Sequence, residues 1–227
     1  RMVDFYLDAG VNGLTILGMM GEASKLTVEE GRTLVRHILK RVDGRVPVVA
    51  GVSAEGFARI ESLSKSVMDD GASAVMIAPP MGLKTDDQIF TYYQQASSFI
   101  DGAPLVLQDF PLATGVQIST SVVAKIMNEL TNCVCLKHED WPGLEKIATL
   151  REPGVLNERI SILCGNGGMF LPEELERGAD GAMTGFGFPE MLADVVRLAA
   201  AGDMDRAQDI FDAYLPLVRY EQQPGAG

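Results

Sequence analysis

The sequence predicts an α/β fold, namely a (β/α)8 TIM barrel that lacks its first strand and carries extra C-terminal helices. Three observations predict it. Short apolar runs alternate with amphipathic helical patterns, which indicates a parallel sheet covered by helices. The turns that lead from helix to strand repeat one form, as in "DDGASAV" and "RGADGAM". The chain also opens on a helical pattern, "RMVDFYLDAG", whereas a βα barrel begins with a strand.

Seven apolar runs are the predicted strands. They start about 20 to 35 residues apart, which is the spacing of βα units. An open doubly wound sheet is the alternative arrangement, and the repeated turns favour the barrel. With one further strand expected upstream of the chain, eight strands would close. The runs are 13–18, 47–53, 74–80, 104–111, 133–140, 160–166 and 181–187.

Helical patterns fill the intervals between these runs. The first spans 27–42, where Thr27-x-x-Glu30 predicts a capping box. The next spans about 55–68 and has one apolar face. Others begin near residues 86, 119, 143 and 190, and a final helix covers 203–219. No linker interrupts the pattern. We therefore predict the barrel over 1–188, and over 189–227 the last barrel helix with the start of a C-terminal helical tail.

The composition excludes several classes of partner. A net charge of −12 and a pI near 4.6 argue against nucleic acid or an anionic membrane surface. No apolar run reaches the roughly 18 residues of a membrane span, and no signal segment opens the chain. The three cysteines have no metal-ligand spacing, so we expect no metal and reduced thiols in a cytoplasmic protein. Cys133 and Cys135 are expected to point to opposite faces of their strand.

Lys137 stands out among the candidate site residues. The site of a (β/α)8 barrel lies at the C-terminal ends of the strands, and Lys137 is the only lysine at those predicted ends. Apolar surroundings lower the pKa of a lysine, and the neutral amine attacks a ketone or aldehyde to form a Schiff base. The alternative is a lysine with a buried stem whose head pairs with Glu139 or Asp140.

Strand alternation assigns faces to its neighbours. If Lys137 points into the barrel, Glu139 shares its face and His138 points out towards the helices. Glu139 is therefore the candidate general acid and base, and His138 is expected to be structural. By the same reasoning Asp109 faces outwards if Gln108 faces inwards.

Two strand ends are rich in glycine. Residues 164–168 read "CGNGG" and 184–187 read "TGFG". Their N–H groups could cradle a phosphate, as in a phosphosugar barrel. They could equally be tight turns that admit a small substrate. No lysine or arginine accompanies either stretch, which weakens the phosphate interpretation.

These residues resemble the dihydrodipicolinate synthase and N-acetylneuraminate lyase superfamily of class I Schiff-base lyases. The stretch "GMMGE" at 18–22 is similar to the family's G-T-T-G-E, and Lys137 stands where the family has its Schiff-base lysine. "GADGAMTGFGFPEM" resembles the family's eighth-strand segment, and "AGDMDRAQDIF" resembles the start of its helical tail. The resemblance implies a small 2-keto acid substrate and no cofactor beyond the covalent lysine imine. It also implies a homo-oligomer, a dimer or tetramer, and a chain without the first strand and most of the tail.

The departures from the family pattern concern its proton relay. The family's Y-N-x-P is Gln108-Asp109-Phe110-Pro111 here, and Met19 and Met20 replace the two threonines. Glutamine has no proton to give near neutral pH. An arginine expected just past this motif is absent, since 112–115 reads "LATG". These losses argue for a changed chemistry and against dihydrodipicolinate synthase itself.

One branch of the family shares the altered motif. The 2-keto-3-deoxy-L-arabonate dehydratases carry Q-D-x-P, K-x-E and G-A-M-T-G-x-G-F-P, and this chain has all three. The resemblance implies that Lys137 forms an imine at C2 and that Glu139 takes a C3 proton while hydroxide leaves C4. We expect a dehydratase or aldolase of a 2-keto-3-deoxy sugar acid. The alternatives are pyruvate condensation and a non-catalytic keto-acid-binding barrel. The expected substrate-binding residues are Met19, Met20, Gly21, Gln108, Gly165, Thr184 and Gly185.

Overall fold

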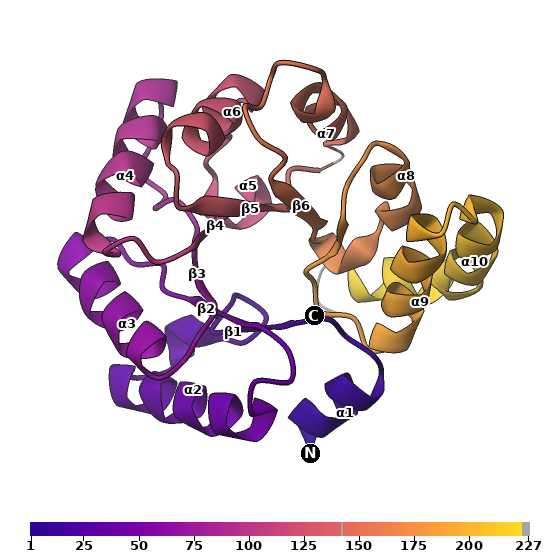
Figure 1. Cartoon of the computed structure of the whole chain (residues 1–227), viewed down its shortest axis with the longest axis horizontal. Helices are drawn as coiled ribbons and strands as arrows, with labels where there is room; N and C mark the ends of the chain where they lie inside the picture. The colour runs from indigo at the N-terminus through magenta and orange to yellow at the C-terminus, as the bar shows by residue number, and fades with distance from the viewer. Residues whose placement is uncertain (142, 224–227) are drawn as a thin grey trace.

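A computed structural model describes residues 1–141 and 143–223. Its centre is one parallel sheet of seven strands, hydrogen-bonded in chain order from β1 to β7. Figure 1 shows this sheet curled inside a ring of helices. A barrel-like α/β fold is thereby confirmed. The strands are β1 Leu14–Ile16, β2 Val48–Gly51, β3 Ala74–Ile77, β4 Leu105–Asp109, β5 Cys133–His138, β6 Ser161–Cys164 and β7 Gly181–Ala182.

The helices follow the predicted order, with additions. The capping box of α2 is present: the Glu30 N–H donates to Thr27 Oγ1, and the Thr27 N–H donates to the Glu30 carboxylate. The short helices α5 and α8 were not predicted, because four and six residues are too few for a periodic pattern. The helices are α1 Met2–Asp8, α2 Val28–Val42, α3 Phe57–Asp69, α4 Asp86–Phe99, α5 Pro111–Thr114, α6 Thr120–Glu129, α7 Leu144–Arg151, α8 Leu171–Glu176, α9 Pro189–Ala200 and α10 Met204–Glu221, with 3-10 turns η1 Ala23–Lys25 and η2 Asn166–Gly168.

Closure of the barrel by an eighth strand depends on the two edges of the sheet. Within residues 1–141 and 143–223, β1 and β7 are the two edges of the sheet. Figure 1 shows α1 in the ring of helices between α2 and α9. An eighth strand between β7 and β1 stays a prediction, as does the division at residue 188. The last four residues of the predicted 189–227 segment lie outside the described residues.

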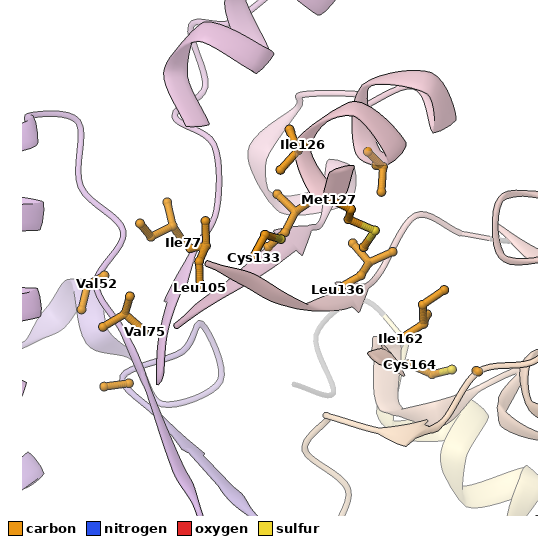
Figure 2. Packing of buried hydrophobic residues seen from close by; sticks show 14 of the residues in the cluster. Val52, Val75, Ile77, Leu105, Ile126, Met127, Cys133, Leu136, Ile162 and Cys164 are labelled. Carbon is orange, nitrogen blue, oxygen red and sulfur yellow. The ribbon is translucent and has the colours of Figure 1, made fainter. Parts of the chain in front are cut away.

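Two apolar layers hold the sheet. The larger lies between the strands and the helices. There Ile126 and Met127 of α6 join outward residues of the strands such as Leu136 (Figure 2). The smaller lies inside the curl of the sheet and consists of Ala74, Met76, Val106 and Cys135. Strand residues alternate between the two layers, as a pleated strand requires.

A bulge in β5 decides which of its residues face inwards. Leu105 of β4 is opposite Cys133, but the next residue, Val106, is opposite Cys135. Val134 is thus skipped, and it is 45% exposed. Cys133 belongs to the outer layer and Cys135 to the inner one. Their predicted opposite orientation is confirmed, but the bulge causes it, because residues two apart in a regular strand share a face.

The helices do not include a membrane span. In the part of the chain that the structure describes, none is both long enough and apolar enough to cross a bilayer.

Candidate active site

Lys137 lies near the C-terminal end of β5, paired with Gln108 of β4 on one side and Leu163 of β6 on the other. It is 9% exposed. Its Nζ lies 3.4 Å from Oε1 of Glu139, which is also buried. The predicted shared face of these two residues is confirmed. The pairing also fits the alternative prediction, in which the lysine stem is buried and its head pairs with Glu139. Asp140, the other partner considered, binds elsewhere.

Glu139 is fixed from several directions. Its backbone N–H donates to the Asp109 carbonyl at 2.8 Å, and its carbonyl accepts from Asn166 Nδ2 at 3.0 Å. Its carboxylate accepts from Gln108 Nε2 at 2.7 Å. Burial raises the pKa of Glu139, while the Lys137 ammonium and the Gln108 amide oppose that rise. A buried carboxyl group beside a cation is a candidate proton carrier.

Gly165 makes room for this carboxylate. It follows β6, and its N–H donates to the His138 carbonyl at 2.8 Å. A Cβ atom at Gly165 would overlap the Glu139 side chain. The "CGNGG" stretch therefore allows Glu139 to approach the end of β6 closely. Whether it also admits a substrate stays a prediction.

The remaining predicted site residues form contacts of their own. Thr184 Oγ1 accepts the Gly167 N–H at 2.7 Å, which joins the two glycine-rich ends. A Cβ at Gly185 would lie 3.7 Å from the Met20 side chain. The end of β7 therefore adjoins the turn after β1. Met20 is 77% exposed and Met19 is also exposed. Whether Met19, Met20 and Gly21 bind substrate stays a prediction.

His138 and Asp109 face away from Lys137, as predicted. His138 Nε2 lies 3.1 Å from the Gly143 carbonyl. Burial, reinforced by the nearby Lys146 ammonium, lowers the pKa of His138 to about 4. The imidazole is therefore neutral at physiological pH, in keeping with a structural role.

An ionic cluster behind the strand ends was missed by sequence reasoning. Lys146 of α7 is buried and pairs with both Asp109 and Asp140, at 2.7 and 2.6 Å. The signal available in the sequence was a lysine beside Ile147 on an otherwise apolar helix face. Its partners come from two other strand ends, and only the fold brings them together. Among the described residues, no group of histidine, cysteine and carboxylate side chains is placed to hold a metal ion.

The structure is thus a barrel-like α/β fold with a lysine and a glutamate buried together at its strand ends. The dihydrodipicolinate synthetase family model matches residues 1–224, and the chain belongs to that family. It is a lyase. The resemblance found in the sequence is thereby confirmed.

Individual relatives carry two different activities in their names. L-2-keto-3-deoxyarabonate dehydratase of Azospirillum brasilense is 33% identical over 235 residues, which cover 98% of this chain and 72% of the relative. The 4-hydroxy-tetrahydrodipicolinate synthase of Persephonella marina is 28% identical over 96% of this chain and 74% of its own. The crystal structure of dihydrodipicolinate synthase from Rhodopseudomonas palustris superposes with a TM-score of 0.95 at 51% identity, covering 99% of this chain and 75% of that one. These relatives belong to one family but are named for different reactions.

Proposed function

We propose that this protein is a Schiff-base lyase that dehydrates a 2-keto-3-deoxy sugar acid or cleaves it as an aldolase. One observation carries the proposal. The Glu139 carboxylate lies 3.4 Å from Lys137 Nζ and 2.7 Å from Gln108 Nε2, in a buried site at the strand ends. A nucleophilic amine and a proton carrier thus lie within reach of the same substrate carbons.

The proposed reaction begins at the keto group. Lys137 passes a proton to Glu139, and the resulting neutral amine adds to C2. That proton then leaves with the C2 oxygen as water, which gives a protonated imine and returns Glu139 to its carboxylate form. Glu139 takes a proton from C3, and the electrons of that C–H bond move into the imine to form an enamine. The enamine then expels the C4 hydroxyl group, which leaves as water with the proton that Glu139 returns. Hydrolysis of the remaining imine releases the unsaturated keto acid and restores the amine.

Aldol cleavage uses the same groups. In that case Glu139 accepts the proton of the C4 hydroxyl group, and the C3–C4 bond breaks to leave an aldehyde and the enamine of pyruvate. The substrate carboxylate is assigned to the backbone N–H groups of Met20 and Gly21. The turn itself is closed by other donors, the N–H groups of Glu22 and Ala23. The proposal needs no cofactor beyond the imine.

Dehydration is favoured over pyruvate condensation by Gln108. It occupies the position of the family's tyrosine, and its amide donates to Glu139. An amide can orient a carboxylate but cannot relay its proton. The named dehydratase from Azospirillum brasilense supports the same choice. Condensation remains the second candidate, because the structurally similar Rhodopseudomonas palustris protein bears the synthase name.

A trapping experiment tests the proposal. The protein is incubated with borohydride and either pyruvate or a 2-keto-3-deoxy sugar acid, and the modified peptide is located by mass spectrometry. The expected result is one adduct on Lys137, which the variant Lys137→Ala lacks. No adduct with any 2-keto acid would refute the Schiff-base chemistry. Loss of turnover in Lys137→Ala would exclude a non-catalytic binding protein.

A screen then separates the reactions. Sugar acids are assayed for dehydration, and pyruvate with aldehydes is assayed for condensation. A phosphosugar barrel is disfavoured because the N–H groups of Gly165, Gly167 and Gly168 already donate within the protein. The proposed dimer or tetramer is checked by light scattering of the purified protein.

A further inference from the structure

The proposed reaction leaves one buried lysine unused. Lys146 of α7 is 7% exposed. Its Nζ donates to Asp109 Oδ2 at 2.7 Å and to the Ile118 carbonyl at 2.7 Å, and it lies 2.6 Å from Asp140 Oδ2. An ammonium has three N–H donors, so these three partners use all of them. A side chain so completely engaged has a fixed position.

The two carboxylates that Lys146 holds are neighbours in sequence of Gln108 and Glu139, whose side chains contact each other beside Lys137. Asp109 follows Gln108, and Asp140 follows Glu139. Both aspartates contact Lys146 on the helix side, so each lies behind the side chain that faces the site. The Glu139 N–H also donates to the Asp109 carbonyl at 2.8 Å. Lys146 therefore joins the ends of β4 and β5 on the outside, directly behind the contact of Gln108 with Glu139 on the inside.

The backbone conformation at the start of α7 places Lys146 close to the end of β5. Gly143, its N-cap, has a φ of 44°, in the left-handed region. A Cβ there would overlap the Asp140 carbonyl and the His138 ring. His138 in turn contacts the Gly143 carbonyl at 3.1 Å. The chain thus turns back closely over the end of β5, and Lys146 follows Gly143 by about one helical turn.

We propose that Lys146 is a positioning residue for the reaction inferred above: by holding Asp109 and Asp140 together, it sets Glu139 at its working distance from Gln108 and Lys137. The inference rests on that proposed function. Asp109 Oδ1 has no hydrogen-bond partner among the described residues, so Lys146 is the side chain that holds this carboxylate. Without the ammonium, the buried Asp109 carboxylate and the partly exposed Asp140 carboxylate would lie close together and repel. A displacement of about 1 Å at a reacting group costs on the order of 100-fold in rate.

Two variants separate positioning from folding. Lys146→Met leaves both carboxylates uncompensated and should strongly destabilise the protein. Lys146→Met combined with Asp109→Asn removes one buried charge of each sign, so its melting temperature should stay near that of the wild type. Lys65→Met is the matched control, because Lys65 pairs with Asp69 on an exposed face of α3.

Two readouts with pyruvate distinguish the steps. Borohydride trapping reports imine formation at Lys137. Exchange of the pyruvate methyl protons in D2O, followed by NMR, reports the proton transfer assigned to Glu139. The double variant should trap pyruvate as the wild type does and should exchange protons about 100-fold more slowly. The control variant should match the wild type in both assays.

If Lys146 had a purely structural role, its loss would not slow proton exchange while leaving borohydride trapping unchanged. A folded double variant that exchanges protons at the wild-type rate would overturn the inference. So would a folded double variant that loses trapping and exchange equally, because the defect would then not lie at Glu139. A wild-type protein that neither traps nor exchanges pyruvate would instead overturn the proposed function, and the positioning role with it.

Discussion

Replacing Glu174 with glutamine should stabilise the protein, and the gain should grow with pH. Glu174 lies in α8, buried against Cys164 of β6. Burial raises the pKa of its carboxyl from 4.5 to about 7, opposed by the Cys164 thiol. The folded protein therefore holds a proton there that the unfolded chain has released. The stability that this proton provides is complete below pH 4.5 and is lost as pH rises through 7.

The size of the effect follows from the same two pKa values. A rise from 4.5 to about 7 corresponds to about 3 kcal/mol of lost stability well above pH 7, and to about 1 kcal/mol at pH 5. A glutamine at this position does not ionise and loses nothing. The advantage of Glu174→Gln over the wild type should therefore increase by about 2 kcal/mol between pH 5 and pH 8.

Urea denaturation at the two pH values measures this difference directly. Glu176→Gln, on an exposed position of the same helix, is the control and should show no pH-dependent gain. Comparing variant with wild type at each pH removes any constant difference between an amide and a carboxyl group. Equal gains at pH 5 and pH 8 would refute the reasoning, because they would mean that burial does not keep this carboxyl protonated.

Three further predictions concern the candidate site. Glu139→Gln should keep pyruvate trapping and reduce turnover by roughly 100- to 10,000-fold, the usual contribution of a general acid or base; unchanged turnover in a steady-state assay would exclude Glu139 as the proton carrier. Gly165→Ala should reduce turnover more than Gly82→Ala, because a Cβ at 165 overlaps Glu139 whereas one at 82 meets nothing within 4 Å; equal kinetics would contradict the packing argument. Gln108→Leu should raise the apparent pKa seen in the pH–rate profile, because it removes a hydrogen bond that favours the ionised Glu139; a profile that does not move would argue against that contact in solution.

Sequence reasoning worked where a local rule decides the structure. The seven strands and the main helices follow from hydrophobic periodicity, and the α2 capping box follows from Thr27 and Glu30. Lys137 and Glu139 could be placed together because alternation along one strand is a local property.

What escaped prediction depends on partners distant in sequence. Lys146 donates to Asp109, which is 37 residues away in sequence, and no local pattern identifies that partner. The contact of the Gln108 amide with Glu139 was not predicted, because it requires the register of β4 against β5, and the predicted binding of substrate by Gln108 stays a prediction. The need for glycine at 165 was likewise invisible, because the atoms that would overlap a side chain belong to Glu139.

The bulge at Val134 shifts the register of β5 against β4 by one residue. Had the strand continued in step with β4, Gln108 would stand opposite Leu136, and Asp109 would stand opposite Lys137. Leu136 and His138 would then face the interior, and the lysine would lie among the helices. One skipped residue thus puts Lys137, in place of Leu136 and His138, on the inner face of the same six-residue strand. A strand end can therefore change its chemistry through a shift in register, with every side chain in it unchanged.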